Sequence, residues 1–165
     1  MSQADLERLA VELGQALVRR GWMLAAAESC TGGWAAQAMT AVPGSSAWFE
    51  RGFVTYSNAA KVDMLGVSED TLTRHGAVSE ATVRQMADGA LRHSRAQAAF
   101  AISGVAGPAG GTPDKPVGTV WFAFALADLP TEAVCMHFSG AREAVRMASV
   151  EYAFRHMLKH LSAMP

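Results

Sequence analysis

The stretch AAAESCTGG at residues 25–33 constrains the fold of this chain more than any other part of its sequence. A short apolar run ends there abruptly at a carboxylate, a hydroxyl, a thiol, a second hydroxyl and two glycines. Directly after it, apolar residues recur at helical spacing at Trp34, Ala35, Ala38 and Met39. The pattern predicts a strand, a tight turn and the start of a helix, with nucleophilic side chains held at the turn.

A turn of this kind places a side-chain oxygen beside unpaired backbone N–H groups at the positive end of a helix. Such groups suit a nucleophile with its oxyanion hole, or a bound anion. The alternative is that the Ser and Thr side chains only cap the helix. Cys30 is intrinsically the better nucleophile at neutral pH, but neighbouring side chains on such a turn point in different directions. The pattern alone does not choose between Ser29 and Cys30.

Length and composition favour one globular domain over residues 1–165. The chain has 165 residues, and 50% of them are hydrophobic, which is enough for a sizeable core. Its net charge is −1 and its basic residues are scattered, so we expect no nucleic-acid partner and no membrane partner. Two cysteines give no disulfide framework. Acidic residues interrupt the N-terminal segment, so it does not have the apolar stretch of a signal peptide. No apolar run reaches the roughly 20 residues that span a bilayer. We therefore predict a cytoplasmic protein.

Helical and strand patterns alternate along the chain. Helices are predicted between Ser2 and Gly21, from Trp34 to about Val42, at Ala59–Leu65, between Ser68 and Gly76, from Ser79 onward, and at Ala141–Leu161. Strands are predicted at Trp22–Ala27, Phe49–Tyr56, Ala98–Ile102, Thr119–Leu126 and Glu132–Phe138. Because the last two strands follow one another without a helix, we predict an α/β fold with a mixed, mostly parallel sheet that contains one antiparallel pair.

Two further segments carry candidate chemistry. The Gly- and Pro-rich residues 103–116 follow a strand, and long loops at strand ends usually bind a ligand. They match neither a dinucleotide fingerprint nor a Walker A loop, so a backbone cradle for phosphate and a structural loop are both open. Tyr56 and Lys61 lie five residues apart, across a strand end and a helix start. A lysine whose pKa is lowered by burial can act as a general base for a serine, and the alternative is an ordinary exposed lysine.

The last helix carries two pairs of residues at a spacing of four. Arg142 and Arg146 share a face and could hold a phosphate or carboxylate, or could pair with surface acids instead. His156 and His160 have the spacing of a metal pair, but no carboxylate is patterned with them. We therefore predict no metal site and no cofactor.

Four segments, in this order, together resemble one family. They are AAAESCTGG at 25–33, YSNAAKVDMLGV at 56–67, GAVSEATV at 76–83 and SGVAGPAGGTPDKPVGTV at 103–120. The chain resembles, over nearly its whole length, the CinA C-terminal domain family, the nicotinamide-nucleotide amidohydrolases. The resemblance implies a three-layer α/β/α fold and hydrolysis of nicotinamide mononucleotide to nicotinate mononucleotide and ammonia. In longer members this domain follows a pyrophosphatase-like domain, and we expect the stand-alone form here.

The resemblance also implies roles for particular residues. A metal-free serine nucleophile, with a lysine and a tyrosine, falls on Ser29, Lys61 and Tyr56. We expect the turn after the first strand to hold the oxyanion, through Cys30, Thr31, Gly32 and Gly33. The residues expected to bind substrate are Glu28, Asn58, Ser103, Gly104, Gly107, Gly110, Gly111 and Arg142.

Other functions are open from the sequence. The Ser29–Lys61 pair could hydrolyse another small amide. The domain could instead bind a nucleotide without catalysis, with Ser29 and Thr31 only capping a helix over a bound phosphate. We also expect a homo-oligomer, with Trp34, Met39 and Trp48 as candidates for a subunit interface.

Overall fold

The computed structural model describes residues 1–165 and contains six α-helices, one short 3-10 helix and five strands. In chain order they are α1 (Gln3–Arg20), β1 (Leu24–Glu28), α2 (Trp34–Thr40), η1 (Ser45–Ala47), β2 (Phe49–Val54), α3 (Asn58–Leu65), α4 (Glu69–His75), α5 (Glu80–Arg92), β3 (Ala98–Gly104), β4 (Thr119–Leu126), β5 (Glu132–His137) and α6 (Arg142–Ala163). Every predicted helix and strand is present, with its ends displaced by at most a few residues. The predicted caps of α1 are also present, since Ser2 forms a capping box with Asp5 and Gly21 ends the helix with φ +66°.

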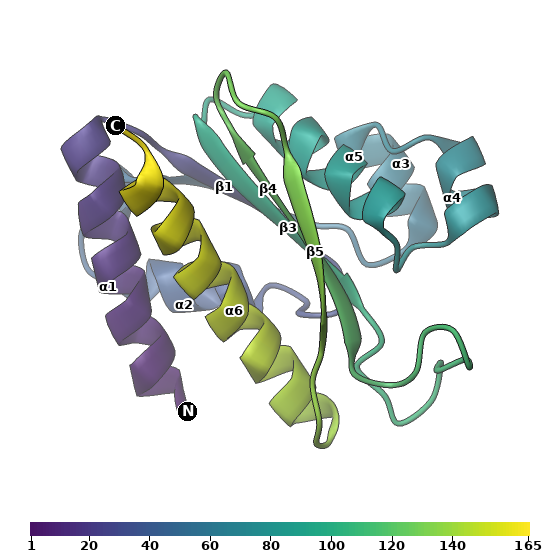
Figure 1. Cartoon of the computed structure of the whole chain (residues 1–165). Helices are drawn as coiled ribbons and strands as arrows, with labels where there is room; N and C mark the ends of the chain where they lie inside the picture. Colours follow the sequence, from purple (N-terminus) through teal and green to yellow (C-terminus); the bar gives the residue numbers. More distant parts are fainter.

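The strands form one mixed sheet in the order β2-β1-β3-β4-β5 (Figure 1). β1 pairs in parallel with β2 and β3, while β4 pairs antiparallel with both β3 and β5. Only β4 therefore runs against the other strands, which confirms the predicted α/β fold with a mixed, mostly parallel sheet. The prediction of one antiparallel pair is wrong, because the loop after β3 turns the chain back along β3 and does not cross the sheet.

Helices cover both faces of the sheet and give the three layers that the family resemblance implies (Figure 1). α1, α2 and α6 pack on one face, over large side chains of the sheet such as Phe100, Phe122 and Phe124. α3, α4 and α5 lie on the other face, where β1, β3 and β4 present alanines to α5. β3 shows the division, because Phe100 points to the first core while Ala99 and Ala101 point to the second. The small side chains let α5 approach the sheet closely.

The residues considered for a subunit interface are mostly internal. Met39 is fully buried, and Trp48 is 4% exposed. The indole ring of Trp48 lies so close to Gly14 of α1 that a Cβ at that position would collide with it. Trp34 is partly buried, with the guanidinium carbon of Arg146 5.4 Å from its ring centroid. Met39 and Trp48 are therefore core residues and cannot form an interface.

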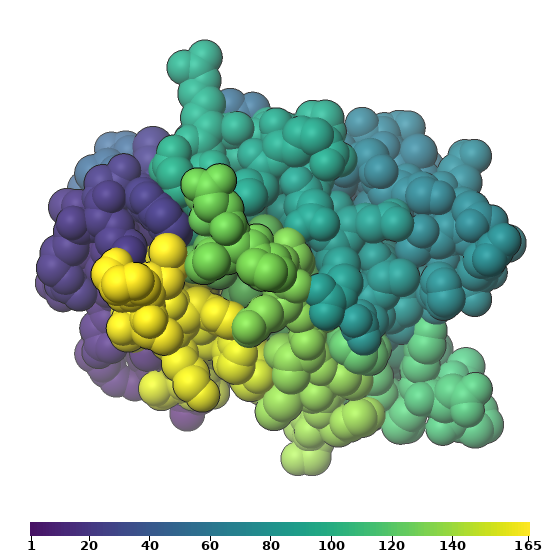
Figure 2. Space-filling view, turned by 45° about the horizontal axis from the view of Figure 1, so that its top comes forward, coloured from purple at the N-terminus to yellow at the C-terminus, as the bar shows by residue number.

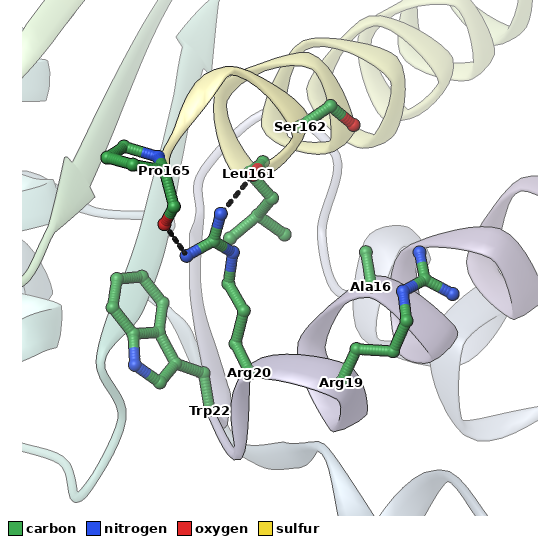
Figure 3. Close-up of a pocket in the computed structure, with 7 residues that line it drawn as sticks. All are labelled: Ala16, Arg19, Arg20, Trp22, Leu161, Ser162 and Pro165. Atoms are coloured by element: carbon green, nitrogen blue, oxygen red, sulfur yellow. Dashed lines mark hydrogen bonds between the residues drawn. The ribbon is translucent and has the colours of Figure 1, made fainter.

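Arg20, the last residue of α1, joins α1 to the C-terminal end of α6 (Figure 3). Its guanidinium donates to the carbonyl oxygens of Leu161 at 2.8 Å and Met164 at 2.7 Å, and its central carbon lies 5.7 Å from the ring centroid of Trp22. Figure 2 shows the resulting contact between the purple N-terminal helix and the yellow end of the chain. None of the helices is both long enough and apolar enough to cross a membrane.

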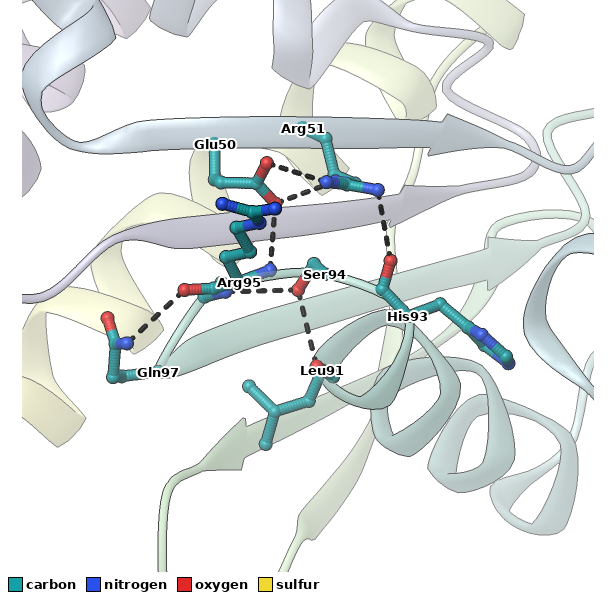
Figure 4. Close-up of polar contacts among 8 residues, drawn as sticks. Glu50, Arg51, Leu91, His93, Ser94, Arg95 and Gln97 are labelled. Carbon is teal, nitrogen blue, oxygen red and sulfur yellow. Dashed lines mark hydrogen bonds and ion pairs between the residues drawn. The ribbon is translucent and has the colours of Figure 1, made fainter.

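A polar cluster joins the start of β2 to the turn between α5 and β3 (Figure 4). Glu50 accepts hydrogen bonds from the Arg51 side chain and from the backbone N–H of Arg95, the latter at 3.0 Å. Arg51 also donates to the carbonyl of His93 at 3.2 Å. The hydrogen bond from Arg51 lowers the pKa of the Glu50 carboxyl. These contacts hold together the amino ends of β2 and β3, at the opposite end of the sheet from the carboxyl ends of the strands.

Candidate active site

The carboxyl ends of β2, β1 and β3 meet at a cleft of about 250 Å³. β1 lies between its two parallel neighbours, and the chain passes from β1 to β2 through α2 on one face and from β2 to β3 through helices on the other. In open α/β sheets such a reversal of strand order opens a crevice where ligands bind. The cleft is lined by Ser29, Cys30, Tyr56, Lys61, Ala77, Val78, Ser103, Gly104, Ala106 and Arg142.

Ser29 follows β1 directly and opens the turn into α2. Its backbone N–H donates to the carbonyl of Ile102 in β3, and its own carbonyl accepts from the N–H of Gly32, both at 3.0 Å. Gly32 and Gly33 have φ values of +59° and +101°, a region that strains any residue with a side chain. The two glycines therefore allow the chain to pass from strand to helix in so few residues. The strand, turn and helix predicted from this segment are confirmed.

Lys61 places a buried amine in the cleft, in contact with Ser29. The residue is 1% exposed, and its Nζ lies 3.0 Å from Ser29 Oγ, 2.8 Å from the carbonyl oxygen of Thr55 and 3.3 Å from that of Tyr56. It forms no salt bridge with a carboxylate. Burial lowers the pKa of this amine from its ordinary value of 10.5, because the charged form loses its hydration. The alternative of an ordinary exposed lysine is therefore wrong.

Cys30 lies beside Ser29 in the cleft, but burial suppresses its reactivity. The residue is 6% exposed, and burial raises the pKa of the thiol to about 11, while the backbone N–H of Gly104 opposes the shift more weakly. The sulfur is thus a neutral thiol near pH 7, and the thiolate is the nucleophilic form. Of the two adjacent side chains, Ser29 is the one with a nucleophilic oxygen in hydrogen-bonding contact with Lys61.

Glu28, predicted to bind substrate, instead caps α2 and does not line the cleft. The residue is 1% exposed. Its carboxylate accepts four hydrogen bonds of 2.7–3.2 Å, from the hydroxyl of Thr31 and the backbone N–H groups of Gly33, Ala35 and Ala36. A carboxylate at this place complements the positive end of the helix and pairs donors that a helix start leaves open. Glu28 is therefore a structural residue of the turn.

Of the four backbone N–H groups predicted to hold the oxyanion, two are already bonded within the protein. Those of Gly32 and Gly33 are bonded to the Ser29 carbonyl and the Glu28 carboxylate. Those of Cys30 and Thr31 form no hydrogen bond with another residue. Cys30 lines the cleft, whereas Thr31 is fully buried and does not line it.

Arg142 and Tyr56 meet at the mouth of the cleft. Arg142, the first residue of α6, donates to the Tyr56 hydroxyl at 3.1 Å and to the carbonyl of Gly107 at 2.8 Å. Tyr56 is 62% exposed. Ser103 lies deeper, and its hydroxyl donates to the carbonyl of Ala77 at 2.8 Å. The Gly-rich segment therefore lines the cleft at its start and supports Arg142 a few residues later.

Three predicted substrate-binding residues lie away from the cleft. Asn58 lines a separate depression with Glu69 and Leu72, and Gly110 and Gly111 belong to the exposed part of the loop that projects from the body in Figure 1. Conversely, no role was predicted for the apolar wall of the cleft. That wall consists of Ala77, Val78 and Ala106, and the only signal for the first two was their place in the matching segment 76–83.

The two residue pairs of α6 also separate. Arg146 points to the turn after Ser29, where it donates to the carbonyls of Cys30 and Thr31, and does not share a ligand site with Arg142. His156 and His160 pack on Phe124, with ring centroids 4.8 and 5.2 Å from it. No group of three or more His, Cys, Asp or Glu side chains is placed to hold a metal ion.

The fold and the cleft define a three-layer α/β protein with a buried serine–lysine pair at the carboxyl ends of its parallel strands. The chain belongs to the CinA C-terminal domain family, whose model matches residues 6–161. The nicotinamide-nucleotide amidohydrolase PncC of Escherichia coli (strain K12) is 56% identical over 157 residues, which is 94% of each chain. The protein of the same name from Pseudomonas putida is 50% identical over 151 residues, 92% of this chain and 94% of that one.

Solved structures agree with this assignment. The competence/damage inducible protein CihA of Agrobacterium tumefaciens superposes with a TM-score of 0.92 at 46% identity, covering 96% of both chains. The competence damage-inducible protein A of Klebsiella pneumoniae superposes with a TM-score of 0.93 at 42% identity, covering 97% of this chain and 99% of that one. The three-layer fold is therefore that of the family.

The cap formed by Glu28 predicts a large loss of stability on its removal. We expect Glu28→Ala to lower the free energy of unfolding by about 3 kcal/mol, because buried donors would lose a charged acceptor. Glu28→Gln keeps an acceptor oxygen and should lose clearly less. Urea denaturation at pH 7 measures both. The exposed Glu12→Ala serves as control and should stay within about 0.5 kcal/mol of wild type; a Glu28→Ala variant as stable as this control would refute the cap.

Proposed function

We propose that this chain hydrolyses the carboxamide of nicotinamide mononucleotide to nicotinate mononucleotide and ammonia, with Ser29 as nucleophile and Lys61 as base. The 3.0 Å contact between Ser29 Oγ and Lys61 Nζ carries the proposal, because it places a hydroxyl beside an amine whose pKa burial lowers. The substrate is supported by two relatives at 56% and 50% identity, both named nicotinamide-nucleotide amidohydrolase.

The first step is attack of Ser29 on the carboxamide carbon. Neutral Lys61 has two N–H groups and one lone pair; if the carbonyls of Thr55 and Tyr56 accept the two N–H groups, the lone pair is left for the Ser29 hydroxyl. The serine proton moves to Nζ as the C–O bond forms, and the electron pair of the carbonyl moves onto its oxygen. The N–H group of Cys30, which lines the cleft, is the donor for this oxyanion, at about 3 kcal/mol.

The second half returns the site to its starting state. Lys61 gives its proton to the nitrogen, the C–N bond breaks, and ammonia leaves an acyl ester on Ser29. Water then attacks the ester and passes a proton to Lys61, which returns it to Ser29 Oγ as the carboxylic acid departs. The balance is one amide and one water to one acid and one ammonia, and no step uses a metal ion or cofactor.

Substrate binding falls to the mouth and wall of the cleft. The Arg142 guanidinium offers N–H donors in a plane that suits a phosphate, and no carboxylate lines the cleft to repel one. Ala77, Val78 and Ala106 suit the flat faces of a pyridine ring. Tyr56 acts at two atoms, since its carbonyl orients Lys61 and its hydroxyl contacts Arg142. The cytoplasmic location and the homo-oligomeric state stay predictions.

The test is ammonia release from nicotinamide mononucleotide in the presence of EDTA. Wild type and Cys30→Ala should turn over, whereas Ser29→Ala and Lys61→Ala should lose about three orders of magnitude or more in kcat, because each removes part of one catalytic unit. Binding of the nucleotide without turnover by wild type would favour a binding domain. Turnover of a different amide only would move the substrate and keep the serine–lysine pair.

Arg142 is tested by a pair of substrates that differ only in the phosphate. Arg142→Met should raise KM for nicotinamide mononucleotide about 10- to 100-fold, because a charge-assisted contact of about 1.5–3 kcal/mol is lost. It should leave KM for nicotinamide riboside, which lacks the phosphate, within about threefold. Equal increases for both substrates would mean that Arg142 does not bind the phosphate.

A further inference from the structure

Arg146 is the one arginine of α6 that reaches the backbone of the turn after Ser29. Its Nε donates to the carbonyl of Cys30 at 3.0 Å, and a terminal nitrogen donates to the carbonyl of Thr31 at 3.1 Å. Its guanidinium lies over the ring of Trp34, with 5.4 Å from its central carbon to the ring centroid. It forms no salt bridge, so its hydrogen bonds go to backbone oxygens of this turn.

These two bonds fix the direction of a peptide group at the cleft. In a trans peptide the C=O and the following N–H point in opposite directions. Arg146 holds the Cys30 carbonyl on the α6 side of the turn, so the N–H of Thr31 must point the other way. In the preceding peptide the Ser29 carbonyl accepts from Gly32, which fixes the N–H of Cys30 in the same manner. The peptide groups on both sides of Cys30 therefore have directions set by named contacts.

We infer that Arg146 is a positioning residue that holds the turn after Ser29 and, with it, the N–H of Cys30 that faces the proposed oxyanion. The inference rests on the proposed serine mechanism and does not depend on which amide is cleaved. Its charge also reaches this part of the turn, since the Arg146 guanidinium acts to lower the pKa of the Cys30 thiol against the larger effect of burial.

Arg142 provides the natural contrast within the same helix. It lines the cleft and meets Tyr56 at the mouth, whereas Arg146, four residues later, is absent from the cleft lining. Loss of Arg142 should therefore appear in KM for the nucleotide, and loss of Arg146 should appear in kcat. An arginine that served only the stability of α6 would change neither constant in the folded enzyme.

The experiment measures kcat and KM of Arg146→Gln and Arg146→Lys with two substrates. One is nicotinamide mononucleotide, and the other is p-nitrophenyl acetate, a small activated ester chosen to acylate Ser29 in the absence of the nucleotide. We expect Arg146→Gln to lose about 100-fold in kcat for the amide, comparable to the loss of one oxyanion donor, with KM within about threefold. Arg146→Lys keeps the charge and one donor and should lose less. The exposed Arg155→Gln, on the same helix and paired with Glu151, is the control and should match wild type.

The outcomes separate this inference from the proposed function. If Arg146→Gln folds and keeps wild-type kcat, or if only KM rises, the positioning role is wrong while the amidohydrolase stands. If wild type cleaves the ester through Ser29 but not the nucleotide, the proposed substrate is wrong, and a roughly 100-fold slower acylation in Arg146→Gln still supports the inference. If Arg146→Gln fails to fold, Arg146→Lys provides the test. The positioning role of Arg146 is wrong if Arg146→Lys is acylated at the wild-type rate and this acylation is abolished by Ser29→Ala.

Discussion

A lysine amine buried without a carboxylate is the constraint on which the site depends. Taking an ammonium ion out of water costs several kcal/mol unless an opposite charge compensates it, and the partners of Lys61 Nζ are two carbonyls and a hydroxyl. The protein meets that cost by lowering the pKa of Lys61. The unfolded chain then binds this proton more tightly than the folded one. The free energy of unfolding therefore increases as pH rises from the lowered pKa of Lys61 toward the ordinary value of a lysine. The same shift makes the amine a base that can accept the proton of Ser29.

The turn that carries Ser29 is held from two sides by buried or half-buried charges. Glu28 binds the amides at the start of α2, and Arg146 binds the carbonyls on the side of α6. Between them, the two glycines supply the backbone angles that the turn requires. Glu28 and Arg146 thus set the backbone geometry of the turn, whereas Lys61 and Arg142 line the cleft.

The sequence predicted the elements well because their signals are local. Apolar periodicity and the capping residues, such as Ser2 and Gly21 on α1, lie within the helix they define. The return of β4 along β3 could not be predicted in the same way, because a 14-residue loop can either turn back or cross the sheet.

The convergence of Ser29 and Lys61 was expected from the family resemblance, and the structure places their side chains 3.0 Å apart. The capping role of Glu28 was not predicted, because a carboxylate before a helix has the same pattern whether it caps the helix or binds a ligand. The side chains of Arg142 and Arg146 point in different directions because of how α6 packs against the rest of the protein. Residue spacing within the helix does not reveal that packing.

The proposed mechanism requires that burial lowers the pKa of Lys61 in the folded protein. It is tested most directly by a pH titration of the lysine side-chain resonances by NMR, in protein labelled at its three lysines. The resonance of Lys61 is identified by its loss in Lys61→Arg. The account predicts that this resonance titrates below 10.5 in the folded protein and returns toward that value when the chain is unfolded in urea. A Lys61 that titrates at or above 10.5 in the folded state would contradict the account, because the amine would then be a cation and could not accept the proton of Ser29.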